Sequence, residues 1–244
     1  NVDRRLNLAI ITVHKGSLEH LLKTLNSIDK QTIKPKKHII VCRDESITRL
    51  NFLKKDYRIF IINKDKSIYH AMNIGIKEAK NLHKLFLNSN DTLFSSFSLQ
   101  RLEKYIKLNI PIIAITALKY KKYIFTIKKD EFKKERYMPH SSFISPMLPK
   151  LDKILFKTNI EIAADGIWMK KIIEKTGKVM KIYNNISLHT LGGISTSPSI
   201  KTIFFQLKYK KLEGLKELLK FILYSFFNKT NYYLLIYKRK YKVK

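Results

Sequence analysis

The stretch LAIITVHKGSLEHLLKTLNSI, residues 8–28, predicts the first strand and helix of an α/β protein. Its first six residues are uncharged and rich in β-branched side chains, which is typical of a strand buried on both faces of a parallel sheet. From Leu18 onward, leucines and isoleucines recur at helical spacing, and Ser17 is a suitable N-cap. A buried strand followed directly by an amphipathic helix is the first half of a β–α–β unit.

The next seventy residues repeat this pattern. Three further apolar runs predict strands at 38–42, 58–63 and 84–88, and SIYHAMNIGIKEAK (67–80) predicts a helix. The order is therefore strand, helix, strand, strand, helix, strand, which predicts an α/β fold with a mostly parallel central sheet flanked by helices. Because ligands in such sheets bind beyond the carboxyl ends of the strands, we expect the chemistry in loops 13–17, 42–48, 63–67 and 88–92.

The second half of the chain is less regular. It predicts a helix at 95–109, two strands that form a hairpin across 121–122, and a helix at 164–177 with Gly177 as its C-cap. From residue 201 the chain is basic and aromatic. We therefore expect a main domain at 1–200 and a helical C-terminal extension at 201–244.

Composition limits the possible functions. The chain of 244 residues has 49 Lys and Arg against 19 Asp and Glu, a net charge of +30, which predicts polyanionic surroundings such as phosphorylated ligands, nucleic acid or an anionic membrane. The single cysteine, Cys42, excludes an intrachain disulfide and a cysteine-based zinc site. The sequence contains no signal-peptide pattern and no apolar run near the ~20 residues of a membrane span, so we expect a cytoplasmic protein.

Six short motifs occur in one order over roughly residues 7–198. They are AIITVHKGSLEHLLKTLNSI, DKSIYHAMNIGIKEAK, LFLNSND, MPHSSF, IAADGIWMKK and HTLGGIST. Together they resemble the family 2 glycosyltransferases with the GT-A fold, and in particular the bacterial members that synthesise surface polysaccharides such as capsule or O-antigen. The resemblance implies an inverting, metal-dependent transfer of a hexosyl or other glycosyl group from a nucleotide-diphosphate sugar.

The resemblance also assigns a metal site at the end of the strand LFLNSND. Asp91 matches the last acid of the family's D-x-D motif and is the predicted ligand of Mn²⁺ or Mg²⁺, with His189 as a second predicted ligand near the diphosphate. Hard cations of this kind prefer oxygen ligands and leave positions open for phosphate. Asn88 and Asn90 are predicted to lie beside sugar and phosphate oxygens. The family usually has an aspartate where this chain has Asn90, so one carboxylate is missing.

The resemblance implies that the nucleobase lies over the end of the first strand and beside the second. The positions that match the family's nucleotide-binding and donor-binding residues are Thr12, His14, Asp44, Asp65 and Asn73. The family's acid after the second strand aligns with Arg43, so either the acid is absent or Asp44 serves with a shift of one residue. Gly75 matches a family position too, but helix–sheet packing explains it equally well.

Asp165 matches the family's general base. In an inverting transfer the base accepts the proton of the acceptor hydroxyl, and a carboxylate at a helix N-terminus suits this role. The alternative for Asp165 is favourable interaction with the helix dipole. Trp168, the only tryptophan, is either a stacking wall for an acceptor sugar or a core residue.

The extension at 201–244 has the composition of an interfacial helix, with lysines interleaved among apolar side chains. We expect it to hold the protein on the inner face of the bacterial cytoplasmic membrane, where a lipid-linked saccharide acceptor would lie. The alternative is a helix that packs on the domain. Two other functions remain open. One is a catalytically impaired binding subunit, suggested by Asn90 and Arg43. The other is a nucleic-acid-binding protein, but the sequence contains no recognised nucleic-acid-binding module, and we do not expect nucleic acid as a partner.

Overall fold

The computed structural model describes residues 4–65, 67–134, 139–160, 164–191, 218–219, 222, 229–238 and 240–243. Its strands are β1 Arg5–His14, β2 Lys34–Cys42, β3 Arg58–Ile62, β4 His83–Phe86, β5 Thr92–Leu93, β6 Ile112–Tyr120, β7 Tyr123–Ile127, β8 Phe143–Ser145, β9 Met180–Thr190 and β10 Tyr241–Val243. Its α-helices are α1 Leu18–Asp29, α2 Ile68–Glu78, α3 Ser98–Ile106, α4 Lys129–Lys134, α5 Ala164–Thr176 and α8 Lys229–Lys238. Four short 3₁₀ helices are described as well: η1 Glu45–Arg49, η2 Asn51–Leu53, η3 His140–Ser142 and η4 Pro149–Leu151.

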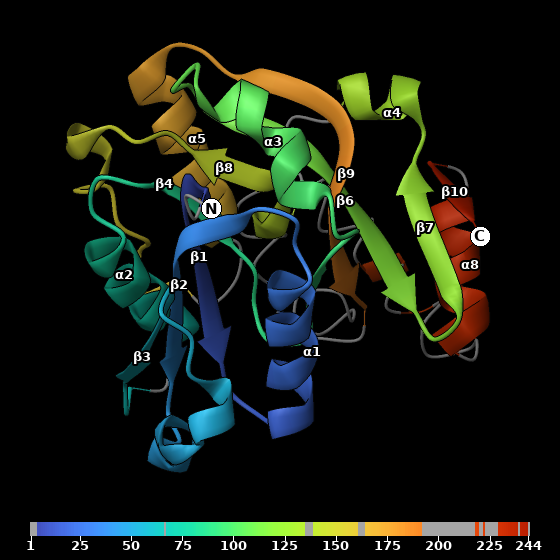
Figure 1. Cartoon of the computed structure of the whole chain (residues 1–244). Helices are drawn as coiled ribbons and strands as arrows, with labels where there is room; N and C mark the ends of the chain where they lie inside the picture. Colours follow the sequence, from blue (N-terminus) through green and yellow to red (C-terminus); the bar gives the residue numbers. More distant parts are fainter. Residues whose placement is uncertain are drawn as a thin grey trace.

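The described strands form a single ten-stranded sheet with helices on both faces (Figure 1). Its order is β10-β7-β6-β8-β4-β1-β2-β3, and β9 pairs with both β5 and β6. The strands predicted in the first ninety residues all run parallel, because β1 pairs with β2 and β4, and β2 pairs with β3. This confirms the α/β class with a mostly parallel core. The carboxyl ends of these strands meet at one edge of the sheet.

The uncharged run in β1 is buried because both faces of the sheet are covered. On one face, Ile11 and Val13 belong to a core that also contains apolar side chains of α2 and α5. On the other face, Leu8 and Ile10 pack with side chains of α1 and α3. Successive side chains of a strand point to opposite faces, so the central part of β1 has apolar residues on both sides of the sheet.

The sequence did not predict β5, β8 and β9, nor β10, which lies in the extension that was expected to be helical. The strand β9 runs parallel to β6 and forms the longest pairing in that half of the sheet, although 59 residues separate the two along the chain. Its sequence, MKIYNNISLHT, mixes apolar and polar residues without strict alternation. The predicted hairpin is confirmed as β6 and β7, which pair antiparallel around the turn at 121–122.

The C-terminal end of the chain joins this sheet. β10 pairs antiparallel with β7, and the Tyr232 and Tyr233 side chains of α8 are buried against Leu118 and Phe125. The predicted interfacial helix falls mostly on residues outside the described part, and the predicted boundary at residue 200 stays a prediction. Among the described residues, no helix combines the length and the apolar character that a membrane span requires.

The close approach of α2 to β1 depends on Gly75. A Cβ atom added to Gly75 would lie 2.3 Å from Cγ2 of Ile11, a β-branched side chain that has little freedom to move away. Packing of α2 on β1 therefore explains Gly75 without a role in donor binding.

We predict that Gly75→Ala lowers the free energy of unfolding by ~1–3 kcal/mol, because the new methyl group overpacks the contact between α2 and β1. Urea denaturation measures this change. The matched control is Gly166→Ala on α5, where an added Cβ meets no atom within 4 Å. Helix propensity should make this control neutral or stabilising by up to ~1 kcal/mol. Equal stability of Gly75→Ala and the unmodified protein would contradict the packing explanation.

Candidate active site

The backbone after β4 stays paired with β1 for a few residues, and the turn at residues 88–91 ends this pairing. The backbone N–H groups of Leu87 and Ser89 donate to carbonyl oxygens of β1, at 2.9 and 3.2 Å, so the chain stays paired with β1 beyond Phe86. The Asp91 N–H then donates to the Asn88 carbonyl oxygen at 3.0 Å and closes the turn. Asn90 adopts a φ of +79°, a left-handed conformation that asparagine tolerates better than most residues. The backbone thus gives a reason for an amide at this position.

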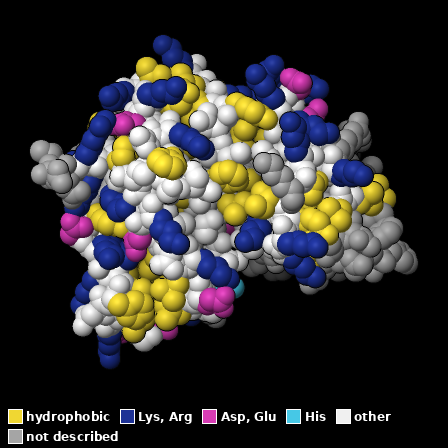
Figure 2. Space-filling view, turned by 45° about the vertical axis from the view of Figure 1, so that its right-hand side comes forward, with side chains coloured by type: hydrophobic (Ala, Val, Ile, Leu, Met, Phe, Trp, Pro, Cys, Tyr) yellow, Lys and Arg dark blue, Asp and Glu magenta, His cyan; other side chains and the backbone are white. Residues whose placement is uncertain are grey.

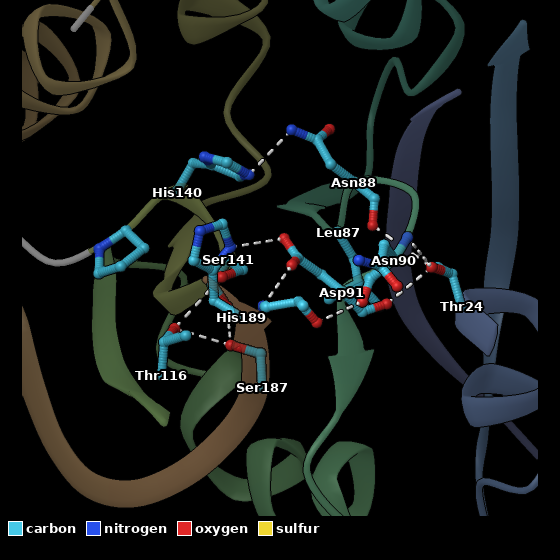
Figure 3. Close-up of polar contacts among 12 residues, drawn as sticks. Thr24, Leu87, Asn88, Asn90, Asp91, Thr116, His140, Ser141, Ser187 and His189 are labelled. Carbon is cyan, nitrogen blue, oxygen red and sulfur yellow. Dashed lines mark hydrogen bonds and ion pairs between the residues drawn. The ribbon is translucent and has the colours of Figure 1, made fainter. Parts of the chain in front are cut away.

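Thr24 on α1 holds this turn from one side. Its hydroxyl donates to the Asp91 carbonyl oxygen at 2.7 Å and accepts the Asn90 N–H at 3.0 Å (Figure 3). Thr24 is fully buried. Thr190 on β9 holds the turn from the other side, because its hydroxyl donates to the Asn90 carbonyl oxygen at 2.9 Å. Neither Thr24 nor Thr190 was predicted, since a threonine within a helix or strand gives no sign of a distant partner.

The Asp91 carboxylate is almost fully buried and faces His189. One carboxylate oxygen lies 2.9 Å from Nδ1 of His189, and the other accepts the Thr190 N–H at 3.1 Å (Figure 3). No Lys or Arg within the described ranges pairs with Asp91, despite the net charge of +30. Burial alone would lower the pKa of His189, but the Asp91 carboxylate, with a contribution from Asp165, outweighs burial and raises that pKa.

A second carboxylate–imidazole pair lies beside the first. Asp165 lies in the first turn of α5, and its Oδ2 lies 3.4 Å from Nδ1 of His140. The other ring nitrogen of His140 lies 3.0 Å from Nδ2 of Asn88. The rings of His140 and His189 meet edge to face with centroids 6.3 Å apart. Burial raises the pKa of Asp165, but His140 and the Gly166 N–H outweigh burial and lower the pKa below its ordinary value.

The structure therefore brings together Asn88, Asn90, Asp91 and His189 and, through His140, Asp165. His140 lies in the motif MPHSSF, which was the signal that could have identified it, although it was not predicted as a site residue. No group of three or more His, Cys, Asp and Glu side chains in the part of the chain described here could bind a metal ion unaided. Asp91 and His189 converge, and each carboxylate oxygen keeps a second lone pair. They could supply two ligands to a hard cation whose other ligands come from a phosphorylated molecule.

Three predicted nucleotide residues lie at the same edge of the sheet. His14 ends β1, and its Nδ1 lies 2.8 Å from Oγ of Ser89 in the turn, while its buried Nε2 has no partner among the described residues. Burial and the nearby His20 lower the pKa of His14, against the effect of Asp44. Asp44 is exposed and accepts the Ser46 N–H at 2.9 Å. Asp65 accepts the Ser67 N–H at 2.8 Å and lies 3.0 Å from the His70 ring.

The other predicted residues have partners inside the protein. Thr12 is fully buried and donates to the Leu87 carbonyl oxygen at 2.8 Å, so its side chain offers no surface to a ligand. The Asn73 side chain accepts the Phe156 N–H at 2.8 Å and donates to the Phe156 carbonyl oxygen at 3.0 Å. These two hydrogen bonds explain this buried amide without a ligand. Trp168 is buried in the core and stacks on Phe156, with ring centroids 4.9 Å apart. The structure therefore supports core packing rather than a stacking wall for an acceptor sugar.

Comparison with known proteins identifies the fold. No protein-family model and no curated protein matches the sequence. Among solved structures, S. aureus TarS 1–349 in complex with UDP matches with a TM-score of 0.64 and 17% identity over 93% of this chain and 74% of that one. The mannosyltransferase PcManGT from Pyrobaculum calidifontis, in complex with GDP-Man and Mn²⁺, matches with a TM-score of 0.60 and 12% identity over 79% of this chain and 59% of that one.

The chain spans 60% of TarS 1–349 in a further crystal structure and 44% of a longer TarS structure. TarS 1–349 in complex with UDP-GlcNAc matches with a TM-score of 0.65 and 15% identity, over 88% of this chain and 71% of that chain. The central sheet and its flanking helices match these structures, so the expected GT-A fold is confirmed.

We predict that Thr24→Val lowers the free energy of unfolding by ~1–3 kcal/mol. The valine keeps the shape of the side chain but leaves the Asp91 carbonyl oxygen without its hydroxyl donor in a buried position. Thr24→Ser, which keeps the hydroxyl, should lose less stability. Hydrogen exchange of the Asn90 and Asp91 amides should also become faster in Thr24→Val, because the turn opens more often.

The control for Thr24→Val is Thr48→Val, where an exposed hydroxyl donates to the Glu45 carbonyl oxygen at 2.7 Å. It should leave the exchange of Asn90 and Asp91 unchanged. Unchanged exchange at these two amides in Thr24→Val would show that the hydroxyl does not hold the turn.

Proposed function

We propose that this protein is a glycosyltransferase that transfers a sugar from a nucleotide-diphosphate sugar to a saccharide acceptor. The observation that supports it most is the buried Asp91–His189 pair at the carboxyl edge of a GT-A sheet, beside the Asp165–His140 pair. The matching structures support it too, since they were solved with UDP, UDP-GlcNAc, and GDP-Man with Mn²⁺. Membership of family 2 and a role in surface-polysaccharide synthesis rest on the sequence motifs and are part of the proposal.

Asp91 and His189 would hold a divalent cation, Mn²⁺ or Mg²⁺, together with the diphosphate of the donor. Their chemistry fits, because the buried carboxylate faces an imidazole and has no Lys or Arg partner among the described residues. When bound, such a cation neutralises the negative charge that develops on the leaving diphosphate. Asn88 and Asn90 lie in the same turn and would orient the sugar and phosphate oxygens.

The nucleoside would lie beside β1, β2 and β3. The buried Nε2 of His14 has no partner in the described part of the chain and is available to a ligand. Asp44 and Asp65, after β2 and β3, are exposed and could accept hydrogen bonds from the base or ribose. Direct side-chain contacts of Thr12 and Asn73 with the donor are not part of the proposal, since both residues are engaged within the protein.

Asp165 would act as the general base of an inverting transfer. Its lowered pKa keeps it ionised at neutral pH, so it can accept the proton of the acceptor hydroxyl. It lies across from the turn that would hold the diphosphate, on the other side of His140. The attacking oxygen would then approach the anomeric carbon from the face opposite the leaving group.

We predict that Asp91→Asn lowers turnover by at least ~10²-fold at saturating Mn²⁺ while the fold is kept, because an amide ligates a hard cation poorly. Release of nucleoside diphosphate from a panel of UDP- and GDP-sugars measures the rate. The control is Asp130→Asn on α4, the same change at an exposed acid. Near-normal turnover by Asp91→Asn would remove Asp91 from the proposed mechanism.

We predict that Asp165→Asn lowers kcat by ~10²–10⁴-fold and leaves donor affinity unchanged, because the amide cannot accept a proton. Single-turnover transfer and equilibrium binding of the donor separate these two effects. Glu174→Gln, an exposed acid on the same helix, is the control. Loss of donor binding by Asp165→Asn would place this residue in the donor site instead.

The proposal includes a lipid-linked acceptor and peripheral attachment to an anionic membrane at the inner face of the bacterial cytoplasmic membrane. Figure 2 shows lysine and arginine side chains spread over the visible face, with few acids among them. The described end of the extension carries exposed lysines on α8 and β10, at Lys238 and Lys242. A surface of this kind favours contact with anionic lipid head groups.

We predict that the protein binds vesicles containing anionic lipid and that Lys238→Glu/Lys242→Glu weakens this binding, since each lysine near the surface contributes ~1 kcal/mol. Vesicle sedimentation over a range of salt concentrations measures it. The control is Lys104→Glu/Lys107→Glu at the end of α3, which changes the net charge equally. Equal weakening by both double variants would show that net charge, rather than this end of the chain, determines binding.

A further inference from the structure

His140 contacts both sides of the candidate active site. One of its ring nitrogens, Nε2, lies 3.0 Å from Nδ2 of Asn88 in the turn, and the other, Nδ1, lies 3.4 Å from Oδ2 of Asp165 at the start of α5. Its side chain is only 13% exposed, so water competes little for these contacts. Figure 3 shows the ring of His140 directed at the Asn88 amide.

The chemistry of the Asn88 amide determines which nitrogen of His140 carries the proton. An amide nitrogen can only donate, so Nε2 of His140 must accept and must be unprotonated. In a neutral imidazole the proton then lies on Nδ1. Nδ1 is the nitrogen that lies 3.4 Å from the Asp165 carboxylate, which can only accept, so a proton on Nδ1 suits this contact.

The backbone beside His140 is held by buried hydroxyl groups. Ser187 on β9 donates to the carbonyl oxygen of Ser141 at 2.7 Å, and its Oγ lies 2.7 Å from Oγ of Thr116 on β6 (Figure 3). All three side chains are buried. Since β9 also carries His189, these bonds connect the backbone beside His140 to the strand that bears the second imidazole.

We infer that His140 is a positioning residue, which holds the Asp165 carboxylate through Nδ1–H and ties it to the donor side of the site through Asn88. The inference rests on the proposed function, in which Asp165 accepts the acceptor's proton. His140 itself touches Asp165 rather than the reacting atoms. A carboxylate held at both the helix N-terminus and an imidazole keeps one orientation, and misplacement of about 1 Å at such a group can reduce a rate ~10²-fold.

Two substitutions separate the two contacts of His140. His140→Asn puts an amide N–H close to the position of Nδ1, where it can donate to Asp165, and His140→Gln puts an amide oxygen close to the position of Nε2, where it can accept from Asn88. We expect His140→Gln to lower kcat by ~10- to 100-fold, and His140→Asn to lower it far less, with the donor dissociation constant unchanged in both. Equal losses in the two variants, or losses that follow their melting temperatures, would overturn the inference.

A double-variant comparison tests whether His140 acts through Asp165. In the Asp165→Asn background, His140→Gln should have little further effect on kcat, because the carboxylate it positions is already absent. A purely structural residue would lower the rate by the same factor in both backgrounds, and this result would overturn the inference.

A measurement without turnover separates this inference from the proposed function. Long-range ¹H–¹⁵N spectra of the imidazoles in the full chain should show His140 protonated at Nδ1, and Asp165→Ala should change that signal. Protonation at Nε2 would overturn the inference even if the protein transfers sugar. Absence of transfer with every donor would reject the proposed function, while the spectra would still decide whether His140 holds Asp165.

Discussion

The buried turn at residues 88–91 is the constraint on which the rest of the site depends. Thr24 on α1 holds its backbone from one side, and Thr190 on β9 holds it from the other. The turn belongs to neither element, so the site exists only when α1, β4 and β9 are all in place. This arrangement directs the Asp91 carboxylate at His189, and it requires at residue 90 the left-handed backbone that asparagine tolerates.

Charge explains why this carboxylate is unusual. In a chain with a net charge of +30, exposed acids readily find lysine or arginine partners, as Glu19, Glu45 and Asp56 do. Asp91 is buried, and among the described residues its only ionisable partner is the imidazole of His189. A histidine can give up its proton to make room for a cation, whereas a lysine in the same place would keep its charge. The pairing therefore leaves the carboxylate usable by a ligand.

The sequence predicted the local features of this fold well and the distant ones poorly. The strand at 8–13 and the helices after residues 17 and 67 follow from runs and spacings that neighbouring residues determine. β9 was missed because its pairing with β6 joins segments far apart in the chain. Asp91, His189 and Asp165 were predicted from motif order, but the contacts of Thr24 and His140 depend on partners 66 and 25 residues away, which no local pattern encodes.

The most direct test of the account is the melting temperature of the full chain with UDP-GlcNAc, GDP-mannose and related nucleotide sugars, each with and without Mn²⁺. A ligand that binds only the folded state raises the apparent stability, by ~2.7 kcal/mol at a hundred times its dissociation constant. We predict a clear rise with at least one nucleotide sugar, larger with Mn²⁺ than without it. No rise with any donor, in the presence or absence of Mn²⁺, would contradict the proposed function.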